Sequence, residues 1–402
     1  MNGAPLLEGL KVVEFAQLIA GPLAGTLLAD LGADVVHVED PVHGDSSRRM
    51  GPAKDGVPLW WKVAGRNKRS ITLDLRTRKG QELAHRLVGW ADVVITNIRY
   101  DTLVRWSLDW ETVHRVNRKA IMLQVTGNGA TSTARNEPGF GKVGEARSGV
   151  VAITGFPDGP PVHTGFSHAD SVTGLMGAFS IAAALTRRHE PDFEGEWIDI
   201  ALFEPLYRLI EWQVIVHDQL GVVPARAGNQ LAVAPAAVIN TYQAADGRWV
   251  TVTSATSRSV QNVAKLLGES VADYATAEQQ LARRERLDQL LRDYVGSRDS
   301  DDAVAAMVTA GVVASRIYDM ADIFADRTYA ERADVIEVPD DELGPVRMQG
   351  IVPKLRHHPG RIWRTGPGHG QDNEIVFREY LGLPADEFEA LVDEGTVGRR
   401  PQ

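Results

Sequence analysis

One carboxylate, Asp170, has neighbours that could support chemistry on an acyl group. It lies in the sequence HADS (168–171), directly before apolar residues with helical spacing: Leu175, Ala178, Phe179, Ala182 and Leu185. Asp170 is therefore expected at or near a helix N-terminus, where two roles are open. It can cap the helix by accepting a hydrogen bond from the first turn. It can also stay ionised beside the positive end of the helix dipole and, where water is excluded, attack an activated acyl group.

Other catalytic groups find little support in the sequence. The chain has no cysteine, which removes thiolate nucleophiles, cysteine-ligated zinc and disulfides. None of its 11 histidines belongs to a His-Glu-x-x-His pair, and the doublet at 357–358 is expected on a surface turn, so no metal site is predicted. The segment GFSHA (165–169) lacks the closing glycine of a serine nucleophile elbow. A carboxylate nucleophile remains.

Composition favours a soluble enzyme that acts on a small molecule. The 402 residues are 44% hydrophobic and 24% charged, which is ordinary for a globular protein. A net charge of -10 argues against a general nucleic-acid or anionic-membrane binder, although a local basic pocket for a phosphorylated ligand stays possible. The N-terminus shows no leader, and the most apolar stretch, 175–185, is shorter than the roughly 20 residues that span a bilayer. We expect a cytoplasmic protein without a membrane anchor.

Alternating strands and helices position these residues. Short apolar runs predict strands at 11–15, 34–39, 70–75, 92–96, 120–125 and 196–202. Helical periodicity predicts helices at 21–32, 80–90 and 203–220. This alternation predicts an α/β fold with a Rossmann-like parallel sheet. The first crossover lacks Gly-x-Gly-x-x-Gly, and no phosphate loop follows any strand, so neither NAD nor ATP is expected.

The second half of the chain predicts a smaller domain. Residues 1–220 form the first part of the large α/β domain, and periodicity is lost over a linker at 221–238. An Asp-Gly turn at 246–247 precedes a strand at 249–252, and helices are expected at 261–267 and 282–295. These elements assign 239–330 to a smaller α+β domain. Residues 331–402 begin with strands and loops and end with helical pieces at 372–381 and 385–392.

Several sequence blocks occur in a familiar order. They are GLKVVE (9–14), AGP (20–22) followed by LGADVVHVE (31–39), NKRSITLD (67–74), and ADS (169–171), which is preceded by GFPDGPP (155–161). Together they resemble the class III coenzyme A transferases, the formyl-CoA transferase and CaiB/BaiF group. The resemblance implies an interlocked homodimer, each subunit a ring threaded by the other, in which residues 331–402 return to complete the large domain.

The resemblance also implies the reaction. Coenzyme A would move from an acyl-CoA thioester to a small free carboxylic acid, with no permanently bound cofactor and with Asp170 as covalent nucleophile. Exchange between thioester and carboxylate is nearly balanced in energy, so the enzyme needs only to store the acyl activation while the partners change. Aspartyl anhydride and aspartyl-CoA thioester intermediates do this. Backbone N–H groups at the helix start and at nearby glycines are expected to stabilise the oxyanions.

Six residues resemble CoA contacts of the family, and Phe140 is added as a seventh candidate: Ala20, Leu73, Leu75, Arg76, Asn97, Arg105 and Phe140. Arg76 and Arg105 suit phosphate groups, although both could equally be solvated surface residues. Phe140 could pack against the CoA arm or in the core. The sequence departs from formyl-CoA transferase at Ile19, Asp40 and Pro138, which replace glutamine, arginine and lysine. Residues 229–235 replace its glycine-rich loop, which argues against oxalate and formate as the acid pair.

Two other functions stay open. Racemases and epimerases of the superfamily pair the aspartate with a histidine about thirty residues earlier, because inversion needs an acid and a base on opposite faces. Phe140 stands at that position here, which disfavours epimerisation, and His168 is expected to serve packing. A non-catalytic CoA-binding protein is the other alternative, against which the retained Asp170 weighs. Glu145 could contact the substrate acid or be structural, and four residues could shape an acid pocket: Trp60, Trp61, Arg135 and Arg147.

Overall fold

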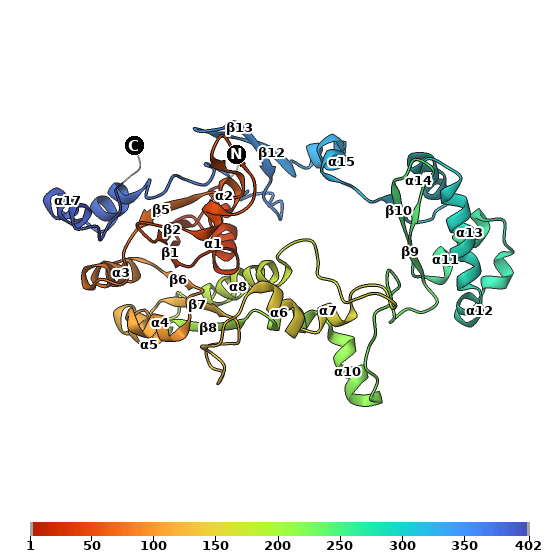
Figure 1. The fold of residues 1–402 in the computed structure, drawn as a ribbon, viewed down its shortest axis with the longest axis horizontal. Coiled ribbons are helices and arrows are strands. Elements are labelled where there is room, and N and C mark those ends of the chain that lie inside the picture. Colours follow the sequence, from red (N-terminus) through yellow and green to blue (C-terminus); the bar gives the residue numbers. More distant parts are fainter. Residues whose placement is uncertain (1–2, 400–402) are drawn as a thin grey trace. The chain divides into compact units, whose positions relative to one another are not determined.

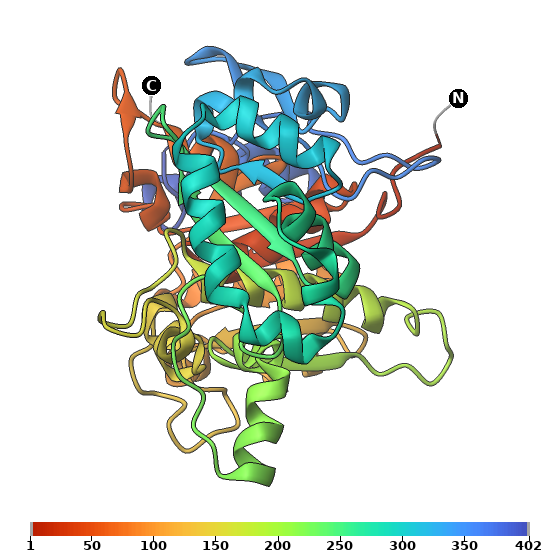
Figure 2. The same ribbon diagram turned by 90° about the vertical axis from the view of Figure 1, so that its right-hand side faces the viewer.

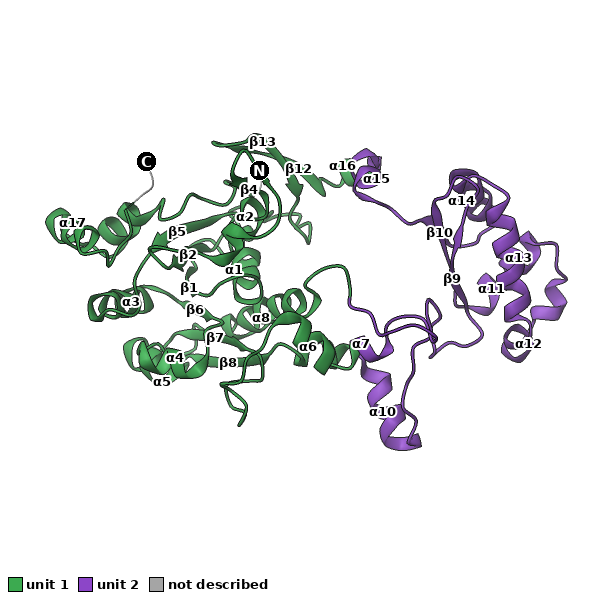
Figure 3. Cartoon of the chain, in the orientation of Figure 1, with its two compact units in different colours: residues 1–150, 164–209, 328–402 green, residues 151–163, 210–327 purple. Residues whose placement is uncertain are grey.

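The structure is a computed structural model that describes residues 3–399. It contains two compact units, shown in Figure 3. The larger unit comprises residues 1–150, 164–209 and 328–402, and the smaller one comprises residues 151–163 and 210–327. The domain boundaries expected from the sequence, at 220, 238 and 330, remain a prediction.

The larger unit is built on a six-stranded parallel sheet (Figure 1). Its strands are β1 (Lys11–Phe15), β2 (Asp34–Glu39), β5 (Lys68–Thr72), β6 (Val93–Thr96), β7 (Ile121–Thr126) and β8 (Glu196–Ala201). The spatial order is β5-β2-β1-β6-β7-β8, and every neighbouring pair is parallel. The predicted α/β class with a parallel sheet is confirmed. Because the order reverses between β1 and β6, loops at the carboxyl ends of these two strands diverge and leave room for a ligand.

Helices cover both faces of this sheet. One face packs against α1 (Ala20–Asp30) and α8 (His168–Leu185), and their shared core includes Val12, Val35, Ile95 and Leu123. The other packs against α3 (Arg78–Trp90), α5 (Trp110–Val116), a π-helical turn (Ile375–Tyr380) and α17 (Ala385–Asp393). The remaining elements of this unit are short: β3 (Ala53–Lys54), β4 (Val57–Pro58), α2 (Leu59–Ala64), α4 (Tyr100–Arg105), α6 (Gly141–Arg147), α9 (Glu204–Leu209), α16 (Arg327–Glu331), β12 (Val335–Asp340) and β13 (Gly344–Gln349).

The C-terminal segment is bonded to the edge strand β5. The backbone N–H of Ser70 donates to Asp372 Oδ2 (2.9 Å), and that of Thr72 donates to Asn373 Oδ1 (2.8 Å). Residues about 300 positions apart in the chain therefore share one sheet edge. The segment covers backbone groups that would otherwise leave this edge unpaired.

The smaller unit is an antiparallel sheet with helices. Its strand order is β11-β10-β9, from β9 (Val238–Gln243), β10 (Trp249–Ser254) and β11 (Ala314–Arg316). Gly247 has a φ of +79°, which suits the predicted turn between β9 and β10. Figure 2 shows this hairpin with the helices around it. The other helices are α7 (Val150–Ile153), which begins at the unit boundary, α10 (Glu211–Leu220), α11 (Ser257–Leu266), α12 (Ala277–Ala282), α13 (Arg284–Gly296), α14 (Ser300–Thr309) and α15 (Met320–Ala325).

The single helix predicted over 203–220 is wrong. The chain forms α9 and α10 instead, interrupted at Ile210, where the larger unit gives way to the smaller. Leu206 in α9 is buried, whereas α10 has no buried residue. The spacing of apolar residues continues across the break, so it predicted one helix. This spacing does not record which part of the fold each helical turn packs against.

The described residues include no helix that is both long and apolar enough to cross a membrane.

Candidate active site

Asp170 lies in the first turn of α8, as the sequence predicted. The helix begins at His168 with Ser167 in the N-cap position, so Asp170 is its third residue. Ser167 makes no side-chain capping bond. Within residues 3–399 the Asp170 carboxylate also receives no hydrogen bond, so the capping role is not observed. The carboxylate is half-buried and is not tied to its own helix.

The carboxylate rests on the backbone of α6. A Cβ atom added at Gly141, the first residue of α6, would lie 1.9 Å from Asp170 Oδ2. Any side chain at this position would displace the carboxylate. Gly141 therefore allows two helix N-termini, those of α6 and α8, to meet around one oxygen.

Burial and a neighbouring acid make Asp170 more basic than a free aspartate. Burial raises its pKa, the charge of Glu145 raises it further, and Lys142 opposes the change, which leaves a pKa of about 6. The pKa lies above the ordinary aspartate value, although Asp170 is near the positive end of a helix, because desolvation disfavours the charged form. At neutral pH the group is still mainly ionised, and its raised basicity makes it a stronger nucleophile.

Glu145 connects the two helices. It is buried, and its carboxylate accepts hydrogen bonds from Lys142 Nζ (3.0 Å to each oxygen) and from the backbone N–H of His168 (3.1 Å). Lys142 also donates to the carbonyl oxygens of Thr164 and Phe166. These bonds fix the start of α8 to α6, so Glu145 has the structural role that the sequence left open.

A cavity of about 270 Å³ lies beside Asp170 at the carboxyl ends of β1, β6 and β7. This is the point where the strand order reverses, the usual ligand site of a doubly wound sheet. Three of the predicted CoA contacts line it together with Asp170: Ala20, Asn97 and Phe140. Phe140 is 66% exposed and is not a core residue. No histidine is among the described residues that line this cavity.

Asn97 also has a structural task at this point. Its Oδ1 accepts a hydrogen bond from the backbone N–H of Gln17 (2.9 Å), and its Nδ2 donates to the Gln17 carbonyl (2.7 Å). The side chain thereby ties the loop after β1 to the end of β6. Contact of Asn97 with CoA remains a prediction.

Three further predicted contacts gather around a second cavity of about 210 Å³. Leu73, Leu75 and Arg76 line it, and it shares Gln17 and Ile98 with the first cavity. Leu73 is only 2% exposed and belongs mainly to the core.

The two predicted phosphate partners lie in different places. Arg76 is exposed and forms ion pairs with Asp74 (2.7 Å) and Asp40 (3.3 Å). Asp40 stands where formyl-CoA transferase has an arginine. It therefore pairs with Arg76, one of the two residues predicted to bind phosphate. Arg105 lines neither cavity and donates to Thr102 Oγ1 (2.9 Å) from an exposed position.

A third cavity, of about 520 Å³, lies on the other side of Leu18 and Ile19. Ser167 and Ser171, on either side of Asp170 in the sequence, line it, as does Trp60. The other three candidates for an acid pocket lie elsewhere: Trp61 is buried beside His37, Arg135 stacks on Tyr100 and Arg147 stacks on Phe203.

Sequence reasoning missed Gly141, Leu18, Ser167 and Ser171. The two serines could have been found from their closeness to Asp170 in the chain, whereas no local signal marks Gly141 or Leu18. Over the described part of the chain, no group of three or more histidine and acidic side chains is placed to hold a metal ion.

Residues 7–373 match CoA-transferase family III. The chain belongs to this family. It is 38% identical to the succinyl-CoA–D-citramalate CoA-transferase of Chloroflexus aurantiacus over 96% of each chain. It is 33% identical to the succinate–glutarate CoA-transferase of Agrobacterium fabrum, with 90% of this chain and 96% of the relative covered.

A solved structure agrees with this assignment. The crystal structure of a CaiB/BaiF family protein from Brucella suis matches with a TM-score of 0.82 and 31% identity. It covers 94% of this chain and all of that chain. The protein is thus a class III CoA-transferase, and the resemblance of its sequence blocks to the CaiB/BaiF group is confirmed.

Proposed function

We propose that this class III CoA-transferase moves coenzyme A from succinyl-CoA to a small dicarboxylic acid through covalent intermediates on Asp170. The observation that carries the proposal is the Asp170 carboxylate, which has no hydrogen-bond donor among the described residues and lines the cavity at the strand reversal. The identity of the acids rests on the relatives, whose names pair succinyl-CoA or succinate with citramalate, malate, glutarate or mesaconate.

The chemistry needs no cofactor. An oxygen of Asp170 attacks the thioester carbonyl, and the carbon–sulfur bond breaks. CoA leaves as a thiolate, and the acyl group stays on Asp170 as a mixed anhydride. The thiolate then attacks the Asp170 carbonyl carbon, the anhydride carbon–oxygen bond breaks, and the donor acid departs. The acceptor carboxylate attacks this aspartyl-CoA thioester, and the released thiolate attacks the acceptor carbonyl of the new anhydride. Asp170 is regenerated, and no oxidant, reductant or nucleotide is consumed.

The two adjoining cavities support a position for CoA. The thioester end lies beside Asp170, with the arm over Phe140, Ala20 and Asn97. The nucleotide end lies towards Leu75 and Arg76, because Gln17 and Ile98 line both cavities and one elongated ligand can extend from the first to the second. Arg105 is a distal phosphate contact from outside both cavities. The larger cavity at Ser167 and Ser171 takes the acyl and acid groups.

The proposal includes a homodimer. Along α8, Leu175 is 60% exposed and Phe179 is 67% exposed. Large apolar residues exposed along one helix are typical of a surface that another chain covers. We place the enzyme in the cytoplasm, with which the absence of cysteine is consistent.

Trapping the intermediate tests the proposed function. The protein is incubated with succinyl-CoA, treated with hydroxylamine or borohydride, and digested for mass spectrometry. We expect a modified Asp170 in the wild type and none in Asp170→Ala, which also loses CoA exchange. A transferase that retains full exchange without Asp170 contradicts the proposal. Deuterium uptake at the α-carbon of a 2-methylacyl-CoA without CoA exchange would instead identify an epimerase, and binding without any adduct would identify a non-catalytic protein.

A further inference from the structure

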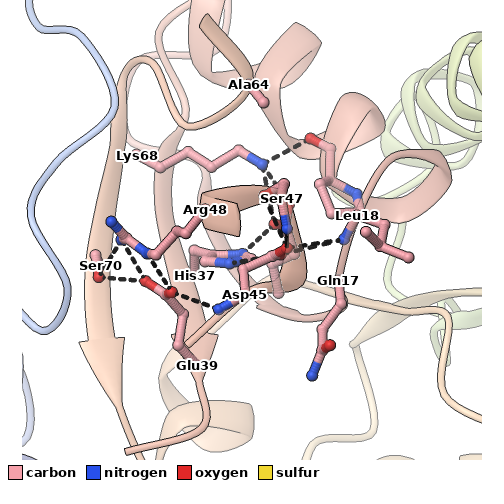
Figure 4. Close-up of polar contacts among 12 residues, drawn as sticks. Gln17, Leu18, His37, Glu39, Asp45, Ser47, Arg48, Ala64, Lys68 and Ser70 are labelled. Carbon is pink, nitrogen blue, oxygen red and sulfur yellow. Dashed lines mark hydrogen bonds and ion pairs between the residues drawn. The ribbon is translucent and has the colours of Figure 1, made fainter. Parts of the chain in front are cut away.

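A buried cluster of charged side chains lies beneath the loop that follows β1 (Figure 4). Three neighbouring strands contribute to it: Glu14 from β1, His37 from β2 and Lys68 from β5. Glu14 and His37 are opposite each other in the strand register, and all three side chains are at most 1% exposed. Charges so far from water are tolerated only where each has a partner.

His37 lies between two carboxylates of this cluster. Its Nδ1 is 2.5 Å from Glu14 Oε1, and its Nε2 is 3.3 Å from Asp45 Oδ2. The second contact has the distance of an ion pair, although it lies off the direction of an ideal hydrogen bond. Lys68 Nζ donates to both Glu14 oxygens (2.9 and 3.1 Å) and to the Pro22 carbonyl at the start of α1 (2.7 Å).

Charge balance requires a protonated His37. Five charged groups surround it: Glu14 on β1, Glu39 on β2, Asp45 and Arg48 near the 3-10 turn (Ser46–Arg49), and Lys68 on β5. Three are negative and two are positive, so only an imidazolium gives each carboxylate a cation. Burial lowers the pKa of His37, but the contacts with the Asp45 and Glu14 carboxylates outweigh it and raise the pKa to about 9.

Asp45 carries the effect of this charge to the active site. Both of its carboxylate oxygens accept from the backbone N–H of Leu18 at 3.2 Å. Leu18 has a φ of +67°, a left-handed conformation that is unfavourable for a leucine and needs an external contact to hold it. It lines both the cavity with Asp170 and the larger cavity with Ser167 and Ser171. In the described part of the chain, His37 is the only cation that forms an ion pair with Asp45.

We propose that His37 is a positioning residue of the transferase: its imidazolium holds Asp45, and Asp45 holds Leu18 at the wall that the two cavities share. This inference rests on the proposed role of Asp170, because Leu18 matters to catalysis only if these cavities hold the substrates.

A charge-neutral variant tests the role of His37. His37→Gln stays neutral at every pH, and the measurement is the single-turnover rate of CoA release from succinyl-CoA between about pH 7 and pH 10. We expect the variant to be about tenfold to a hundredfold slower, because a displaced active-site wall misaligns the reacting atoms. We also expect the wild-type rate to fall above a pH of about 9, as His37 loses its proton, and this fall to be absent in the variant.

Tyr242→Phe is the matched control. It removes the hydrogen bond that the buried Tyr242 donates to Asp288 (2.8 Å) in the smaller unit. Its single-turnover rate, and the fall of that rate at alkaline pH (the alkaline limb of the pH–rate profile), are expected to equal those of the wild type. A His37→Gln enzyme that keeps the wild-type rate and alkaline limb, and loses only melting temperature as the control does, overturns the inference.

Two further measurements keep the result unambiguous. If His37→Gln does not fold, the His37 imidazole of the wild type is titrated with pH and followed by NMR. A midpoint near 9 supports the proposal, and a midpoint near the free value of about 6.5 overturns it. Asp170→Ala in the same assay separates the two proposals. CoA release without Asp170 contradicts the proposed function, whereas loss of release in Asp170→Ala with an unchanged rate in His37→Gln contradicts only the role of His37.

Discussion

At the scale of single residues, Asp170 is tuned by its surroundings and not by its own helix. Burial and the charge of Glu145 raise its pKa, and Lys142 limits the rise. The result is a carboxylate that is basic enough to be a good nucleophile and still mainly ionised at neutral pH. Two predictions follow from this balance, one for activity and one for stability.

Replacing Glu145 with glutamine should move the acid limb of the pH–rate profile. In the wild type, the rate of CoA release should fall as pH drops below about 6, because protonated Asp170 cannot attack. Glu145→Gln removes a negative neighbour, so the pKa of Asp170 falls and activity persists to lower pH. Glu190→Gln, the same change at a half-buried site beyond α8, is the control and should leave the acid limb in place. If the acid limb of Glu145→Gln stayed where it is in the wild type, the charge of Glu145 would not set the basicity of Asp170.

Replacing Asp170 with asparagine should stabilise the fold at neutral pH. The pKa of Asp170 is raised on folding from 3.8 to about 6, so ionisation destabilises the folded state above that range and does not do so below it. Asp170→Asn should melt at a higher temperature than the wild type at pH 7.5, and the difference should shrink as pH falls from about 6 towards 3.8, as followed by thermal denaturation. Asp192→Asn, at an exposed site, should show no such trend. Equal melting temperatures at every pH would contradict the destabilising burial of Asp170.

At the scale of elements, the active site depends on close approach between backbones. The N-terminus of α6 reaches Asp170 because residue 141 has no side chain, and the preceding segment is equally tight. A Cβ at Gly139 would lie 2.4 Å from the Cα of Gly127, at the end of β7. Glycine is needed at these points for contact and not for turn geometry.

Adding one methyl group at Gly141 should separate activity from folding. The new Cβ would meet the far end of the Asp170 side chain, which can move without unfolding the helix. We expect Gly141→Ala to remain folded and to lose activity by about a hundredfold, measured as single-turnover CoA release. Gly89→Ala, in α3 with nothing within 4 Å of the added Cβ, is the control, and it should keep full activity with equal or higher melting temperature. Full activity in Gly141→Ala would contradict the contact.

At the scale of the whole molecule, the chain leaves the larger unit and returns to it. Residues 328–402 belong with residues 1–150 and bond to β5 through Asp372 and Asn373. The stability of the sheet edge therefore depends on residues far from it in sequence. The domain bounds expected from the sequence, with 331–402 as the returning segment, stay a prediction.

The proposed dimer predicts an effect of charge on the exposed face of α8. Light scattering after size exclusion should give twice the 43.9 kDa of one chain. Phe179→Glu places a charge on a 67% exposed apolar site and should shift the protein towards the monomer, because a buried unpaired charge opposes association. Val308→Glu, at a 57% exposed site in α14, is the control and should remain dimeric. A wild-type protein that elutes as a monomer at all concentrations would contradict the dimer.

The sequence alone determined the features that depend on neighbours in the chain. Short apolar runs predicted six strands that overlap those of the parallel sheet, because strands covered on both faces are rich in apolar residues. The bounds of β5 were wrong, since this strand spans Lys68–Thr72 and not 70–75. The spacing after Asp170 predicted the start of α8, because helical periodicity is a local property.

Only the tertiary structure decided what surrounds Asp170. The contact with Gly141, the effect of Glu145 on the pKa and the cavity at the strand reversal all join segments that are distant in sequence. The division of the helix at Ile210 likewise depends on which unit each half joins. Burial and electrostatic fields are sums over neighbours in space, and no local pattern of residues records which neighbours those will be.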